Sequence, residues 1–367
     1  MKITQYKIIY FLIILSGLLL FPTLADKGGM VISNRFYISQ IAVFTFVSGI
    51  LGAMLLWKFN KLISILSGLL IFGVLKTIVL QEAPLLNIYE SAIQGFGIFI
   101  VYYFFRSINT KEDLLNWFLV PSVLNILIIF VQKLDHHILY FLPFDSVTGL
   151  LGNPGMSAGY IALTMPLLYK RSKILCLLGL MAIIFCNASM AFLASVSGVM
   201  FYLYFNKRRN FRIGFLLLIL FSLLFIKFAD INSYKNEIHF RATMIVGATH
   251  FGLHNPVLGW GVGAFAPIMS IVKPEDSIYL GIPFNTPHAF MNNPHNEIVS
   301  GFCKIGIAFP ILIVLIFIDK IKRFNPNNVM PFSILIAGSV YSMGYFFTLP
   351  LCLLFISALS IYENQGG

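Results

Sequence analysis

The chain has 367 residues, of which 58% are hydrophobic and only 11% are charged. A soluble domain is nearer half apolar and a quarter charged, so this composition excludes an ordinary water-soluble globular protein. The net charge of +11 does not indicate nucleic-acid binding, because Lys and Arg stand in short clusters between apolar runs, where membrane orientation explains them.

Long apolar runs without period-two alternation predict an all-α fold, a polytopic membrane bundle of about twelve transmembrane helices. The missing alternation also argues against a transmembrane β-barrel. We divide the chain into N-terminal helices over 1–229, a periplasmic loop subdomain with short helices over 230–296, and C-terminal helices over 297–367. The predicted helices are 6–24, 37–57, 62–80, 88–105, 114–133, 154–169, 172–186, 188–206, 211–229, 297–318, 330–346 and 348–362.

The distribution of basic residues predicts that both termini are cytoplasmic. With the N-terminus inside, every cytoplasmic connection carries at least two basic residues, sixteen of the 25 in all. All seven histidines and the long loop then lie outside. We therefore expect a multi-pass protein of the bacterial inner membrane whose active face is periplasmic. ATP and nucleotide sugars are not expected there, so any reaction needs a donor that is already activated and already across the membrane.

The loop 230–296 differs from the rest of the chain in its polar and turn-forming residues. It holds five of the seven histidines and many Pro, Gly and Asn residues, which mark turns. A stretch at about 237–252 predicts a short amphipathic helix, and a glycine run from Gly259 to Gly263 follows it. The run lacks the Lys-Ser/Thr of a nucleotide-binding loop. It is either a turn that lets backbones pack closely or a source of N–H groups for a pyrophosphate.

The loop ends at His295-Asn296-Glu297, where the next helix is predicted to begin. A histidine near the positive end of a helix is favoured in its neutral form, which can accept a proton. His295 is therefore a candidate general base. The alternative is a purely structural histidine that caps or hydrogen-bonds the loop.

In the order and spacing of several short segments, the chain resembles the O-antigen ligase and polymerase family of membrane glycosyltransferases. The resemblance covers about 150–360, and residues 1–150 add only a compatible number of helices. The segments are Leu151-Gly152-Asn153-Pro154, Arg241, Asn255-Pro256-x-x-Gly259-x-Gly261-x-Gly263-x-Phe265, His295-Asn296-Glu297-Ile298, Gly306 and Phe347-Thr348-Leu349-Pro350-Leu351.

The resemblance implies a donor glycan linked to undecaprenyl pyrophosphate, an acceptor such as lipid A–core, contact with membrane lipid, and no cofactor or metal. His295 would be the general base, and Arg241 would clamp the pyrophosphate, since a guanidinium binds phosphate oxygens in pairs. Ser189 is present, but the arginine that usually follows it in the family is missing, so other cations would assist. The candidate cations are Lys235, Lys304 and Arg35, and the supporting residues are Asn296, Glu297, Ser189 and Gly261.

Three of the basic residues have alternative interpretations. Arg241 could instead pair with Glu237 or meet lipid headgroups. Lys304 could extend outward to the membrane surface rather than reach the donor, since a lysine within the membrane is costly unless paired or hydrated. Lys76 is expected to pair with Glu90 near the outer surface.

Other functions remain open at this stage. Within the family, a polymerase that joins repeat units would use the same chemistry, and a relative that glycosylates protein is a third choice of acceptor. A transporter or flippase would also suit twelve spans. However, the two halves show no internal repeat and no matching pair of broken helices, which transporters often have.

Overall fold

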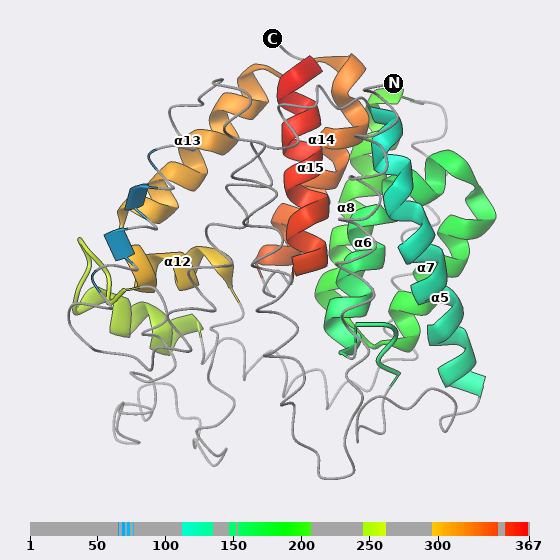
Figure 1. Ribbon diagram of the computed structural model, residues 1–367, viewed down its shortest axis with the longest axis horizontal. Coiled ribbons are helices and arrows are strands. Elements are labelled where there is room, and N and C mark those ends of the chain that lie inside the picture. Colours follow the sequence, from blue (N-terminus) through cyan, green and yellow to red (C-terminus); the bar gives the residue numbers. More distant parts are fainter. Residues whose placement is uncertain are drawn as a thin grey trace, which may run out of the picture.

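The structure is a computed structural model in which every regular element of the described residues is a helix (Figure 1). This agrees with the predicted all-α class. The described residues are 65, 68, 69, 72, 73, 76, 112–134, 147–151, 153–206, 245–261, 296–343 and 349–365.

Six α-helices and a preceding 3-10 helix pack into one bundle with a continuous apolar core. Helix α8 lies between α6 and α14, α7 packs on α5 and α6, and α15 packs on α14. The elements are η1 Glu112–Phe118, α5 Leu119–Leu134, α6 Pro154–Arg171, α7 Lys173–Phe185, α8 Ser189–Asn206, α14 Val329–Ser342 and α15 Leu349–Gln365. The remaining labelled elements are α12 Glu297–Ile305, α13 Ala308–Lys322 and η4 Pro326–Asn328.

Capping residues explain why α6 and α7 begin where they do. The side chain of Asn153 accepts a hydrogen bond from Met156 N at 3.1 Å, and Pro154 occupies the first helical position. Ser172 ends α6 with an extended backbone and caps α7 through Leu175 N. These are the residue types that the first turn of a helix prefers.

Most predicted helices in the described residues are confirmed to within a few residues. The predicted spans 114–133, 154–169, 172–186, 188–206, 330–346 and 348–362 correspond to η1 with α5, then α6, α7, α8, α14 and α15. The single predicted span 297–318 is wrong. It divides at Gly306 into α12 and α13, because Gly306 has φ 76° and ends α12.

Two described helical segments, Leu114–Leu134 and Ser189–Asn206, are long and apolar enough to cross a membrane. The apolar helices Lys173–Phe185 and Leu353–Tyr362 are shorter. The predicted spans 6–24, 37–57, 88–105 and 211–229 lie outside the described residues, as does all of 62–80 except six residues.

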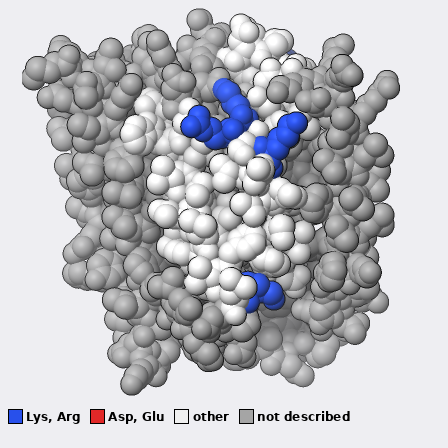
Figure 2. All heavy atoms as spheres, turned by 90° about the vertical axis from the view of Figure 1, so that its right-hand side faces the viewer, with Lys and Arg blue, Asp and Glu red and all other residues white. Residues whose placement is uncertain are grey.

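One end of the bundle, here called the basic end, collects positive charge. It comprises the end of α6, the start of α7 and the end of α13 (Figure 1). Its six basic residues are Lys170, Arg171, Lys173, Lys320, Lys322 and Arg323. Figure 2 shows one face of the molecule, on which the described Lys and Arg residues gather toward the upper and lower parts and leave an uncharged band between them.

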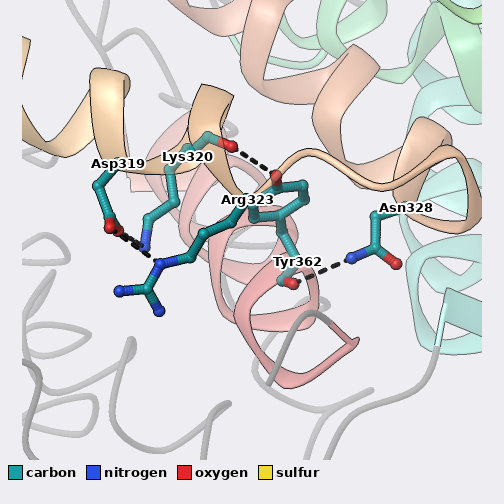
Figure 3. Close-up of polar contacts among 5 residues, drawn as sticks. All are labelled: Asp319, Lys320, Arg323, Asn328 and Tyr362. Atoms are coloured by element: carbon teal, nitrogen blue, oxygen red, sulfur yellow. Dashed lines mark hydrogen bonds and ion pairs between the residues drawn. The ribbon is translucent and has the colours of Figure 1, made fainter.

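Ion pairs within α13 and hydrogen bonds that join α13 and η4 to α15 lie close together at the basic end (Figure 3). Asp319 accepts from Lys320 Nζ at 3.0 Å and from Arg323 Nε at 2.9 Å. The hydroxyl of Tyr362 donates to Lys320 O at 2.6 Å, and Asn328 Nδ2 donates to Tyr362 O at 3.4 Å. Lys320 is only 3% exposed, so its pairing with Asp319 offsets the cost of burying the ammonium group.

Candidate functional site

The candidate residues that the structure describes lie at the end of the bundle opposite the basic end, on or next to α12, or hydrogen-bonded to the end of α12. We call this the motif end; α6, α8 and α15 begin there (Figure 1). The described candidates are Ser189, Gly261, Asn296, Glu297 and Lys304. The candidates His295, Arg241, Lys235 and Arg35 lie outside the described residues.

The turn at 147–151, which leads into the Asn153-Pro154 segment, is held by buried side chains of α5. Gln132 Oε1 accepts from Thr148 N at 3.1 Å and from Gly149 N at 2.8 Å. Asn125 Oδ1 accepts from Leu150 N at 2.8 Å. Asn125 and Gln132 are seven residues apart and so lie on one face of the helix. Their carboxamides supply the partners that these buried N–H groups need.

Replacing Gln132 with leucine is expected to destabilise the protein. Two backbone N–H groups would lose their acceptor inside the protein, at a cost of about 1–3 kcal/mol for each group left unsatisfied. The thermal midpoint of the purified protein in detergent should fall by several degrees. The matched control is Lys133→Leu at the neighbouring exposed position, which should leave the midpoint nearly unchanged. Equal midpoints for Gln132→Leu and wild type would refute this account of the turn.

The first turn of α12 is capped by Asn296, as the sequence predicts for a helix start. Its Oδ1 accepts from Ile298 N and Val299 N, both at 3.0 Å. Its Nδ2 donates to Met343 O, also at 3.0 Å, at the end of α14. Glu297, the first residue of α12, places a carboxylate where the helix dipole favours negative charge.

A short paired segment, here called the clasp, joins residues 256–261 to residues 303–307. Trp260 N donates to Cys303 O at 2.7 Å, and Gly261 N donates to Lys304 O at 2.9 Å. Ile307 N returns a bond to Pro256 O at 2.7 Å. The N–H groups of Trp260 and Gly261 are therefore engaged within the protein. This arrangement favours the interpretation of the glycine run as a close-packing turn.

The clasp requires glycine at two positions. A Cβ on Gly259 would lie 2.5 Å from the carbonyl carbon of Lys304, and Gly259 has φ 62°. A Cβ on Gly306 would lie 2.1 Å from Val257 O, and Gly306 has φ 76°. Both the backbone conformation and the available space exclude side chains here. Gly306 thus breaks the predicted span 297–318 because residues 256 and 257 of the clasp occupy the space beside it.

Residues 245–253 form a helix that packs on α12, within the stretch predicted to be a short helix. Cys303 Sγ donates to Ala248 O at 3.0 Å. The ring of Phe251 stacks on Trp260 with centroids 4.7 Å apart, and Trp260 Nε1 donates to Phe251 O at 3.0 Å. The helix and the clasp are therefore one packed unit attached to α12.

Two histidines at the end of this helix form a pair that sequence reasoning missed. His250 and His254 are four residues apart, their ring centroids are 4.9 Å apart, and His254 Nδ1 lies 3.0 Å from His250 O. Their spacing of four residues, which puts both side chains on one face of a helix, could have predicted the pair. Within the described residues, no group of three or more His, Cys, Asp or Glu residues gathers as a metal site would require.

One lysine contacts the clasp from outside, and another belongs to it. Lys76, 183 residues away in sequence, donates from Nζ to Gly259 O. This is a different partner from the predicted Glu90, which lies outside the described residues. Lys304 is partly buried at the end of α12, and its carbonyl accepts the bond from Gly261 N.

The last turn of α14 connects the start of α6 to the start of α12. The hydroxyl of Tyr341 donates to Gly155 O at 2.9 Å, and Met343 O accepts from Asn296. Gly155 directly follows the Leu151-Gly152-Asn153-Pro154 segment of the resemblance, so the start of α6, the 255–261 segment and the 296–306 segment are linked through hydrogen bonds. Ser189, the first residue of α8, is buried at the same end.

No family model, curated protein or solved structure matches the chain.

Proposed function

We propose that the protein is a membrane glycosyltransferase that moves a glycan from undecaprenyl pyrophosphate to an acceptor hydroxyl on the periplasmic face. Ligation of O-antigen to lipid A–core is the favoured reaction. The observation that carries the proposal is a chain of hydrogen bonds that links the start of α6 to the start of α12 through residues 341–343, and links the end of α12 to residues 256–261. These segments lie far apart in sequence, and their linkage through hydrogen bonds supports the proposal that they serve a common site.

The charge distribution supports the orientation that this function needs. In the orientation we propose, the basic end faces the cytoplasm, where basic residues concentrate in membrane proteins. The motif end then faces the periplasm. The apolar side chains exposed on α5, which include Val120, Leu124 and Leu127, would face lipid. The proposed function would accordingly require a multi-pass protein of the inner membrane.

The proposed reaction is a displacement at the anomeric carbon of the donor glycan. His295 takes the proton of the acceptor hydroxyl while that oxygen bonds to the anomeric carbon. The bond between the anomeric carbon and the pyrophosphate oxygen breaks, and undecaprenyl pyrophosphate leaves with the electron pair. Arg241 neutralises the phosphate charge, with help from among Lys235, Lys304 and Arg35.

Reconstitution tests the proposal directly. The purified protein in liposomes should convert undecaprenyl-pyrophosphate-linked glycan and lipid A–core into glycosylated core, with release of undecaprenyl pyrophosphate. A product made of joined repeat units would instead identify a polymerase. Movement of the lipid-linked glycan between leaflets without any covalent product would contradict the proposal and indicate a flippase.

A further inference from the structure

The side chain of Asn296 contacts two helices at once. Its Oδ1 caps α12 through Ile298 N and Val299 N, while its Nδ2 donates to Met343 O, 47 residues away. A cap uses only the oxygen, and serine or aspartate would provide it equally well. The bond to Met343 is the part of this arrangement that requires an amide.

Met343 lies two residues after Tyr341, which is hydrogen-bonded to α6. Tyr341 is 1% exposed, and its hydroxyl bonds to Gly155 O at 2.9 Å. Its ring covers Gly159 so closely that a Cβ there would lie 2.3 Å from a ring carbon. Residues 341–343 therefore form a joint with the start of α6 on one side and the start of α12 on the other.

We propose that Asn296 is a positioning residue, whose amide fixes the start of α12 against the 341–343 joint. His295 is bonded covalently to Asn296, so fixing Asn296 limits where the imidazole can lie relative to the start of α6. This inference rests on the proposed function, in which His295 is the general base. Placement matters because reacting atoms must come within about 3–3.5 Å, and small errors lower the rate.

Two substitutions at Asn296 separate positioning from capping. Asn296→Asp keeps the capping oxygen and adds a negative charge that a helix N-terminus favours, but it removes the amide donor. Asn296→Ser also keeps a capping oxygen, but it replaces the amide donor that bonds to Met343 O with a shorter hydroxyl. We expect both variants to have kcat lowered at least about tenfold, with KM for the donor and the melting temperature little changed. If Asn296 acted only as a cap, Asn296→Asp would be as active as wild type, and that result would overturn the proposal.

Asn325→Ser is the matched control. Asn325 caps η4 at the basic end through a bond from Asn327 N at 3.0 Å, and it lies outside the motif segments and the 341–343 joint. The same change of an asparagine cap to serine should leave kcat unaltered. An equal loss of kcat in Asn325→Ser would show that the assay responds to any cap replacement, and this would overturn the assignment to the joint.

Hydrogen exchange tests the joint without any turnover. In Asn296→Ser, amides at 339–343 should exchange faster, whereas amides at 298–302 should keep their protection. Unchanged exchange at 339–343 would refute the joint, and faster exchange with normal kcat would refute its positioning role. If wild type transfers no glycan, the proposed function fails by itself, and the exchange data still decide whether the joint exists.

Discussion

His295→Ala is expected to lower the rate of glycan transfer by about 10²–10⁴-fold, the usual contribution of a general base. The expectation follows from the role proposed for the imidazole in removing the proton of the acceptor hydroxyl. The measurement is the initial rate of transfer from labelled undecaprenyl-pyrophosphate-linked glycan, in membranes that hold equal amounts of each variant. Some activity should remain, because donor binding and charge neutralisation do not depend on His295.

His136→Ala is the control for the His295 experiment. His136 belongs to a histidine pair, His136-His137, that is predicted to lie on the periplasmic side. The pair is not part of any segment of the resemblance. Its loss should leave the rate of transfer unchanged. Full activity in His295→Ala would show that His295 is not the general base of the reaction.

Gly306→Ala is expected to have the largest effect on stability. Gly306 has φ 76° and ψ −168°, a conformation that costs other residues about 1–3 kcal/mol. The added methyl group would also lie 2.1 Å from Val257 O, so the clasp would have to open. Opening it breaks the bond from Ile307 N to Pro256 O and separates the 245–261 unit from α12. We expect a large drop in the thermal midpoint and in the yield of monodisperse protein.

Gly68→Ala provides the matched comparison for Gly306→Ala. Gly68 lies in a helical segment, and a Cβ there would have nothing within 4 Å. Alanine is preferred over glycine in helices, so this change should be neutral or stabilising. A thermal midpoint for Gly306→Ala equal to that of Gly68→Ala would contradict the packing described for the clasp.

The sequence predicted the bundle helices well because local signals set their limits. Asn153 with Pro154 marks the start of α6, and Ser172 marks the boundary with α7. The division of 297–318 was not predictable in this way. The run contains two glycines, Gly301 and Gly306, and only the second ends a helix. The cause of the break at Gly306 is a segment about fifty residues earlier in the chain, at Pro256 and Val257.

The candidate site was predictable in its motifs but not in its connections. The resemblance named Asn296 and Gly261, and Lys304 was a separate candidate cation. The structure joins Gly261 and Lys304 through backbone atoms. The bond from Asn296 to Met343 and the bond from Lys76 to Gly259 are long-range contacts that no sequence spacing encodes. The roles assigned to His295 and Arg241 remain predictions for experiment.

Deleting the gene in its bacterial host and separating the envelope glycans on a gel would test the central claim most directly. The proposal predicts bare lipid A–core, with polymer accumulating on undecaprenyl pyrophosphate, and rescue by wild type but not by His295→Ala at equal protein level. An unchanged glycan profile in the deletion strain would contradict the assignment of glycan transfer to this protein.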